Sequence, residues 1–363
     1  MVALTLVKNM GPVSFRRLFE AFGSLEGIFR SNFRTFERAK GPAKIDWKEI
    51  QAEAHLKEAE AEIDKASCAG VSVITCLDEA YPALLKEIHD PPMVLYVKGK
   101  IPADQFSKVA VVGSRKASFY GVRMAKSISA ELAQAGVVVV SGLAEGIDSA
   151  AHEGALSGGG QTVAVLGGGL GKLYPPSNRK LFEKIAENGA VISEYPMDMA
   201  PLAPYFAVRN RIIAGLSEAT VVVEAQEKSG ALITTDVALS EGRDVFAVPG
   251  NADSLNSKGT NNLLKQGAKP VTGAADILEE LQARDLFSKK KTASGSRAQK
   301  VPCIPRSAEE DQILSFLESE SLHVDEIVDL CGRPVNQTIS ALSGMEVKGI
   351  VKQHPGKFFS KSV

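Results

Sequence analysis

The sequence predicts an α/β protein in which a doubly wound, mostly parallel sheet lies between a small helical N-terminal module and a C-terminal winged helix. Three observations carry this prediction. Short β-branched runs alternate with helical segments over residues 71–250, which is typical of a parallel sheet with helices on both faces. Residues 1–65 show only helical periodicity, and residues 308–363 show three helical segments followed by two short strands.

The helical module is indicated by apolar residues at helical spacing. Leu18, Phe19 and Phe22 share one face after a Gly-Pro pair, and a Gly-Ser break separates them from Ile28 and Phe29. We therefore expect short helices over residues 1–65.

The sheet is expected over residues 66–286. One helix of this region is especially clear, because residues 120–135 have helical apolar spacing and Gly136 stands where a helix would end. Doubly wound sheets bind ligands at the carboxyl ends of their strands. The predicted strands are residues 71–75, 93–99, 108–113, 137–142, 162–167, 190–195, 219–225 and 244–250.

The C-terminal part is predicted to begin after a linker. Residues 287–307 are basic, contain Ser, Gly and Pro, and lack periodicity. Three helices and a hairpin about residues 354–356 make a winged helix-turn-helix the economical interpretation of residues 308–363. Its third helix carries no arginine and one lysine, which favours an accessory contact over specific duplex recognition.

Composition restricts the class of protein. The chain has 42 basic and 43 acidic residues, so a polyanion would have to bind a local patch. The four cysteines are too scattered for a C-x-x-C zinc or redox pair and too few for a disulfide scaffold. No apolar run approaches the roughly 18 residues of a membrane helix. We expect a cytoplasmic protein without a metal, a cofactor or membrane insertion.

The third strand ends in a turn suited to an anion. Gly113 gives the backbone freedom, Ser114 offers a hydroxyl and an amide, and Arg115 offers a bidentate fork beside Lys116. A helix N-terminus follows and would favour negative charge. A plain strand-to-helix turn with Arg115 paired to a local carboxylate is the alternative.

Further strand ends carry glycines or a hydroxyl, at Ser141-Gly142 and at Gly167 to Gly169. Ser229-Gly230 opens a predicted helix, whose N-terminus could also face an anion. Nucleotide motifs fail at the glycine run. A G-x-G-x-x-G would need glycine where Lys172 stands, and a Walker loop would need Ser or Thr at Leu173. Close backbone approach by another group is the better explanation.

Two arginines precede an apolar helical segment. Arg209 and Arg211 are two residues apart, so on a helix they point in different directions. One could hold a phosphate while the other braces the domain. For any single arginine a bracing or surface ion pair is the ordinary alternative.

Catalytic motifs are weak. His152 and Glu153 begin an H-E-x-x-H pattern, but Leu156 occupies the second histidine position. Asp148 and His152 share a helix face, which fits either an acid/base pair or a helix cap with a hydrogen-bonded histidine. No G-x-S-x-G elbow is present. A binding platform is therefore favoured over an enzyme.

The motifs together resemble the DprA/Smf family of bacterial DNA-processing proteins. The similarity runs from YPALL at Tyr81 to GTNNLLKQGA, ending near Val271, and includes VGSRKASFYG, SGLAEGIDSAAHEGAL, RNRIIAGLS and EAQEKSGALITT. The resemblance implies an extended Rossmann-like domain that binds and protects single-stranded DNA. It also implies a partner, the RecA recombinase, and a homodimer formed through that domain.

The resemblance also implies which residues contact DNA. The family's basic pocket surrounds a G-S-R turn and an R-N-R block. This chain departs from the family's glycine-loop pattern at Gly168 and Gly171. Pro176 stands at a position that is commonly basic in the family, and Lys172 or Arg179 would supply that positive charge instead. The expected DNA-binding residues are Gly113, Ser114, Arg115, Lys116, Ser141, Gly142, Gly167, Gly169, Lys172, Arg179, Phe206, Arg209, Asn210, Arg211, Ser229 and Gly230.

Two other classes remain open. One is a nucleotide-processing enzyme similar to the LOG phosphoribohydrolases, whose P-G-G-x-G-T block is interrupted here as VPGNADSLNSKGT. The other is a regulator with a ligand-sensing α/β domain and a winged-helix reader, which tight preference for one duplex sequence would support.

Overall fold

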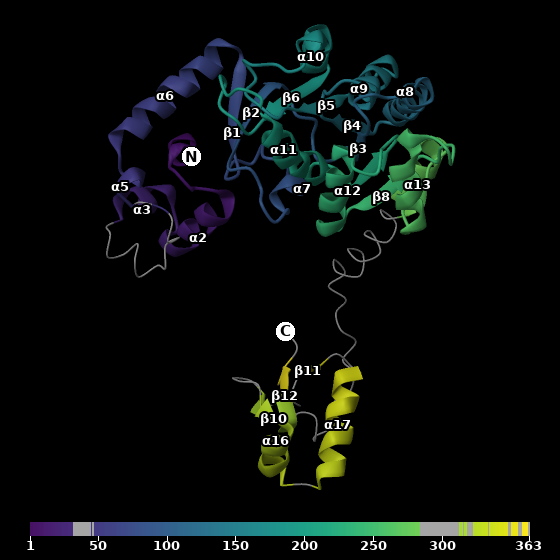
Figure 1. Ribbon diagram of the computed structural model, residues 1–363. Helices are drawn as coiled ribbons and strands as arrows, with labels where there is room; N and C mark the ends of the chain where they lie inside the picture. The colour runs from purple at the N-terminus through teal and green to yellow at the C-terminus, as the bar shows by residue number, and fades with distance from the viewer. Residues whose placement is uncertain are drawn as a thin grey trace. The chain divides into compact units, whose positions relative to one another are not determined.

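A computed structural model describes residues 1–31, 45, 47–283, 312–314, 316–317, 322–332, 334–347, 350–354 and 358–361 (Figure 1). The chain divides into two compact units, Met1–Asp285 and Leu286–Val363. The predicted linker, residues 287–307, lies outside the described residues.

The first unit is built on a nine-stranded sheet in the order β1-β2-β6-β5-β4-β3-β7-β8-β9. All neighbours pair in parallel except β1 with β2 and β2 with β6. The strands are β1 (Val71–Thr75), β2 (Val94–Gly99), β3 (Lys108–Val112), β4 (Val138–Ser141), β5 (Thr162–Val165), β6 (Gly189–Ser193), β7 (Ala219–Val222), β8 (Asp244–Ala247) and β9 (Lys269–Pro270).

This topology confirms the predicted doubly wound, mostly parallel sheet. From β3 the chain adds β4, β5 and β6 on one side and then β7, β8 and β9 on the other, so the switch point lies at the carboxyl ends of β3 and β7. Two features were not predicted from sequence: the antiparallel direction of β1 and β2, and the two-residue edge strand β9.

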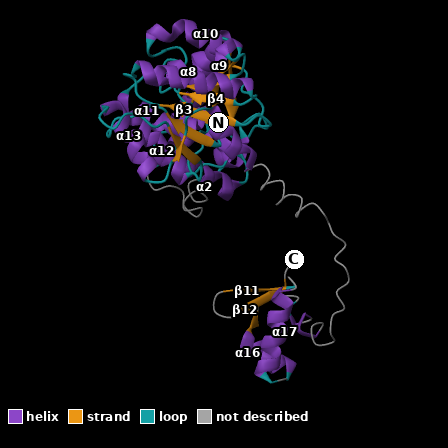
Figure 2. Ribbon diagram, turned by 90° about the vertical axis from the view of Figure 1, so that its right-hand side faces the viewer, coloured by secondary structure: helices purple, strands orange, loops and turns teal. Residues whose placement is uncertain are grey.

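Helices cover both faces of the sheet, and Figure 2 shows the strands enclosed between them. On β3, Val109 and Val111 face the core formed with α8 (Phe119–Gln134) and α9 (Ile147–Ser157). Ala110 and Val112 face the opposite core. Strand side chains alternate between faces, so a continuous apolar run fills both layers. The second layer contains α7 (Ala83–Lys86), α11 (Ala203–Gly215) and α12 (Gly230–Ser240).

The N-terminal helices share a core with the sheet. Trp47 and Leu18 belong to the same apolar cluster as Tyr96 of β2. Figure 1 shows α6 as the long helix that leads from the N-terminal helices to β1, and it runs through the expected boundary at residues 65/66. The helices are α1 (Val2–Leu6), α2 (Pro12–Phe22), α3 (Leu25–Arg30), α5 (Trp47–Ile50) and α6 (Glu53–Cys68).

Further elements complete the first unit, namely η1 (Pro176–Asn178), α10 (Arg179–Glu187), η2 (Leu255–Ser257), α13 (Lys258–Lys265) and helical residues 274–283. No described helix has the length and hydropathy needed to span a bilayer.

The second unit has the elements of a winged helix. β10 (Leu322–His323) and β11 (Val351–His354) both pair antiparallel with β12 (Phe358–Lys361). α16 (Val324–Cys331) and α17 (Val335–Val347) pack around a core that contains Ile327, Leu342 and Met345. Half of the first predicted helix, residues 309–318, and most of the turn of the predicted hairpin lie outside the described residues.

Candidate functional site

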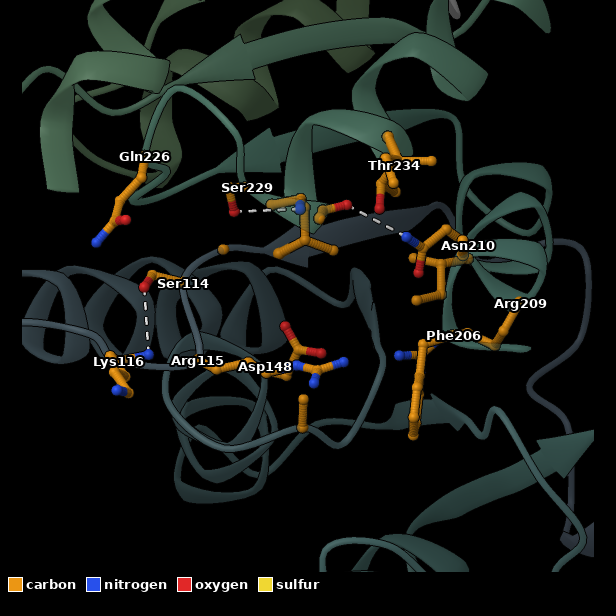
Figure 3. A pocket seen from close by; sticks show the side chains of 18 of the residues that line it. Ser114, Arg115, Lys116, Asp148, Phe206, Arg209, Asn210, Gln226, Ser229 and Thr234 are labelled. Atoms are coloured by element: carbon orange, nitrogen blue, oxygen red, sulfur yellow. Dashed lines mark hydrogen bonds between the residues drawn. The ribbon is translucent and has the colours of Figure 1, made fainter. Parts of the chain in front are cut away.

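A cavity of about 510 Å³ lies at the switch point (Figure 3). It is bounded by the turn after β3, the segment after β7, and the helices α11 and α12. Of the expected site residues, nine line this cavity: Gly113, Ser114, Arg115, Lys116, Phe206, Arg209, Asn210, Ser229 and Gly230. The fold therefore gathers residues from three sequence blocks at the place where doubly wound sheets bind ligands.

The turn after β3 is hydrogen-bonded to the segment that follows the neighbouring strand, β7. Ser114 N donates to the Glu224 carbonyl at 2.8 Å, and Lys116 N donates to Ser114 Oγ at 3.2 Å. A Cβ on Gly113 would lie 2.7 Å from Ile147 Cγ1, so the strand end has no room for a side chain. The side chains of Arg115 and Lys116 remain exposed, and they are the groups that the turn offers to an anion.

The N-terminus of α8 is occupied by a carboxylate of the same chain, that of Glu224. Ser118 caps the helix by accepting from Gly121 N, and Ser118 N donates to Glu224 Oε2 at 2.9 Å. Ser118 Oγ donates to the other Glu224 oxygen. The sequence predicted that a ligand anion would meet this helix end, but the buried Glu224 carboxylate occupies it. Glu224 is 106 residues away in the sequence and showed no local signal.

Arg115 lies over an aromatic ring. Its guanidinium carbon is 4.9 Å from the Phe206 ring centroid, and the Phe206 and Tyr174 centroids are 5.9 Å apart. Both distances fit attractive cation–π and aromatic geometry. A Cβ on Gly167 would come within 2.8 Å of Phe206 Cδ1, so this glycine makes room for the ring. Arg115 forms no hydrogen bond or ion pair with the rest of the described chain, which leaves its donors available to a ligand.

Arg209 is a buried brace beneath the cavity. Its Nη1 donates to the Gly142 carbonyl at 2.6 Å and to the Val165 carbonyl, so it joins the ends of β4 and β5. Burial disfavours the charged form and lowers the pKa of Arg209 to about 10, with Asp148 opposing this shift. Arg209 Nε has no partner among the described residues.

Asp148 is the acidic side chain among the described residues that line the cavity. It is buried, and burial raises the pKa of its carboxyl group while the nearby cations of Arg209 and Arg115 oppose the rise. Asp148 and Arg115 both line the cavity (Figure 3). Asp148 therefore offsets part of the positive charge of the cavity.

His152 fits the hydrogen-bonded alternative. Its Nδ1 lies 2.7 Å from Thr162 Oγ1, which itself donates to the Val139 carbonyl. Thr162 Oγ1 must then accept from Nδ1–H. Burial lowers the pKa of His152 to about 3, so the ring is neutral at physiological pH. A neutral, fully buried histidine with no solvent contact is poorly suited to transfer protons.

The start of α12 closes the opposite side of the cavity. Ser229 caps this helix by accepting from Ala231 N, and Asn210 Nδ2 donates to the Gly230 carbonyl at 3.4 Å. A Cβ on Gly230 would meet nothing within 4 Å, so the backbone here is open to an approaching ligand. The positive end of the α12 dipole favours an anion at this point.

Arg211 lies away from the cavity. It pairs with Glu194 through Nη1 at 3.0 Å and Nη2 at 2.6 Å, and its Nε bonds Asp90 at 3.2 Å. Although burial opposes it, these carboxylates raise the pKa of Arg211. The sequence suggested that one arginine of the block binds phosphate, whereas both are held by the protein's own acceptors.

The remaining expected residues serve other contacts. Ser141 Oγ donates to the Val111 carbonyl, and Gly169 N donates to the Met199 carbonyl at 2.9 Å. Arg179 pairs with Glu183 at 3.9 Å on α10. Exposed Lys172 does not line the cavity. Within the described residues, no cluster of His, Cys, Asp or Glu could hold a metal ion.

These features define a class: a Rossmann-like α/β protein with a cavity at the switch point, where three cationic side chains outnumber one carboxylate among the described lining residues. Residues 72–282 match the sequence model of the family described as DNA recombination-mediator protein A, and residues 297–357 match the DprA winged helix domain. The chain belongs to the DNA recombination-mediator protein A family, as its motifs predicted.

Relatives agree with this assignment. The chain is 34% identical to Protein Smf of Synechocystis, over 99% of this chain and 98% of that protein. Among solved structures it is similar to DNA processing protein A of Streptococcus pneumoniae, with 38% identity, a TM-score of 0.58, and coverage of 73% and 96% of the two chains.

A second similar solved structure is that of DNA processing protein A from Helicobacter pylori, which was determined for its single-stranded DNA binding mode. It shares 31% identity and a TM-score of 0.52, and the match covers 59% of this chain and 96% of that one.

Proposed function

We propose that this protein is a non-enzymatic mediator that binds single-stranded DNA in the switch-point cavity. It would protect incoming DNA and help to load the RecA recombinase during natural transformation and recombination. The observation that carries the proposal is the exposed Arg115 guanidinium, which is stacked on Phe206 at the mouth of a basic cavity and has no hydrogen-bonding partner of its own among the described residues.

The cavity suits a phosphate backbone. Arg115 and Lys116 supply exposed cations, and the first turn of α12 adds an open backbone at Gly230. These groups contact phosphates without reading bases, so binding should be largely independent of sequence and sensitive to salt. The Phe206 and Tyr174 rings offer faces on which bases can stack.

The absence of an enzymatic role is part of the proposal. His152 is buried, neutral and bonded to Thr162, so it does not form an acid/base pair with Asp148. A nucleotide-processing enzyme of the LOG type is the alternative, and release of a free base from a nucleoside monophosphate would support it.

The cellular setting and partners are proposed from family membership. We expect a cytoplasmic homodimer formed through the Rossmann-like unit. Light scattering of the purified chain would give the mass of the assembly. RecA-dependent ATP hydrolysis on DNA coated with single-strand binding protein would test loading, since a mediator should shorten the lag.

DNA binding itself is tested by fluorescence anisotropy of a labelled oligo-dT strand with unlabelled competitors. We expect single-stranded competitor to displace the probe at far lower concentration than duplex of the same length. Equal competition by one particular duplex sequence would favour the regulator, and absence of oligo-dT binding would refute the proposal.

A further inference from the structure

The aromatic ring of Phe119 stands almost entirely in solvent at the first position of α8, with 85% of its surface exposed. Among the described residues, Phe119 belongs neither to the cavity lining nor to an apolar core. A large aromatic side chain in this position gains nothing from burial within the chain, so its faces are available to a ligand.

The backbone that carries Phe119 is rigid. Ser118 caps the helix and is held by Glu224, and a Cβ on Gly121 would lie 2.5 Å from Glu224 Oε2. Tyr120 Oη donates to the Pro249 carbonyl at 2.9 Å. These contacts hold the residues around Phe119 and leave its own ring free. Because the backbone is held, a ligand that stacks on the ring has to fix only the two side-chain torsions of Phe119.

Phe119 lies at the same carboxyl edge of the sheet as the cavity, because its neighbours Ser118 and Tyr120 contact the segments just after β7 and β8. Tyr120 is tied to Pro249 just beyond β8, whereas Phe206 packs against Gly167 just beyond β5. Strands β4, β3 and β7 lie between β5 and β8, so four strand spacings separate the two points, about 19 Å at about 4.8 Å each. Arg115 lies between them, because it follows β3 and contacts Phe206.

The surroundings of Phe119 are suited to a polyanion. The first turn of α8 contains no acidic residue, exposed Arg123 lies one helical turn further on, and exposed Lys116 precedes the helix. Lys116 also lines the cavity, and its carbonyl accepts from Asn256 Nδ2 at 3.1 Å. Cations thus extend from the cavity to the ring.

We infer that Phe119 is a second base-stacking platform, and that a single strand crosses the carboxyl edge of the sheet from Phe206, past Arg115 and Lys116, to Phe119. This inference rests on the proposed function and adds a binding position to it. At the 3.4 Å rise of a stacked strand, the track of about 19 Å corresponds to about six nucleotides.

The test compares variants at two exposed apolar positions by anisotropy with labelled dT20. Phe119→Ala should weaken binding about fivefold or more, because a stacked base contributes at least that factor. Phe119→Trp should bind like the wild type. Leu56→Ala is the matched control, because Leu56 is exposed on α6, and it should change nothing.

Tryptophan emission gives an independent readout. The chain's one native tryptophan, Trp47, is buried in the N-terminal core, so Phe119→Trp adds an exposed reporter at the platform. Addition of unlabelled dT20 should quench this added emission.

The outcomes separate the two proposals. If the wild type binds dT20 but Phe119→Ala binds equally well and Phe119→Trp is not quenched, the platform is refuted while the proposed function stands. A change in molecular mass for Phe119→Ala, with unchanged dT20 affinity, would overturn the inference in favour of a contact between copies. Absence of wild-type binding would refute both.

Discussion

Replacement of Gly142 by alanine should destabilise the Rossmann-like unit through Arg209. An added Cβ would lie 2.6 Å from the Cζ atom of the buried Arg209, so the guanidinium would have to leave its present position. The substitution should displace Nη1 from the carbonyls of Gly142 and Val165. A hydrogen bond from a charged donor contributes about 1.5–3 kcal/mol, so the loss of two gives about 3 kcal/mol or more.

Urea unfolding followed by Trp47 fluorescence measures this loss in the appropriate part of the chain. Trp47 shares an apolar cluster with Leu143, the residue next to Gly142, whereas the winged helix belongs to the other unit. Gly230→Ala is the matched control, because an added Cβ there meets nothing within 4 Å, and it should change the free energy of unfolding by less than about 0.5 kcal/mol. A loss below about 1 kcal/mol for Gly142→Ala would refute the bracing role of Arg209.

Three further substitutions test other contacts. Arg211→Ala should cost about 3 kcal/mol in urea unfolding by leaving the largely enclosed Glu194 carboxylate unpaired, with oligo-dT affinity unchanged; a large loss of affinity would contradict this. The pKa of His152 is about 3 in the folded chain and 6.5 for an ordinary histidine, so its contribution to the free energy of unfolding is fully present above pH 6.5. This contribution falls as the pH drops toward 3, by up to about 1.4 kcal/mol per pH unit. His152→Gln should therefore reduce the difference between the free energies of unfolding measured by urea titration at pH 7 and at pH 5. Ser118→Ala should cost about 1–2 kcal/mol in the same assay, because it removes a helix cap and a partner of Glu224, and no change would indicate that the cap is dispensable.

The sheet was well predicted from sequence because its strands are local features. Runs such as residues 108–112 and 219–222 are short, rich in β-branched residues and buried on both faces, so length and composition together distinguish them from helices. Strand direction is not local. β1 and β2 form an antiparallel pair at the sheet edge, and their short runs look like those of the parallel strands.

The cavity was predicted in part. Parallel strand ends meet at one edge, so the turn at Arg115 and the start of α12 at Ser229 could be placed together from sequence. The partners of Arg209 could not, because its acceptors are backbone carbonyls 44 and 67 residues away. Glu224 likewise caps a helix 106 residues away. Such contacts depend on which strands become neighbours.

The most direct test of the account is the salt dependence of oligo-dT binding by the wild type, Arg115→Ala and Arg179→Ala. The two variants lose the same charge, but only Arg115 lies in the cavity, whereas Arg179 pairs with Glu183 on α10. We predict weaker binding and a log Kd against log salt slope smaller by about 0.7 for Arg115→Ala, with Arg179→Ala matching the wild type. Unchanged affinity and slope for Arg115→Ala would contradict phosphate binding at the switch point.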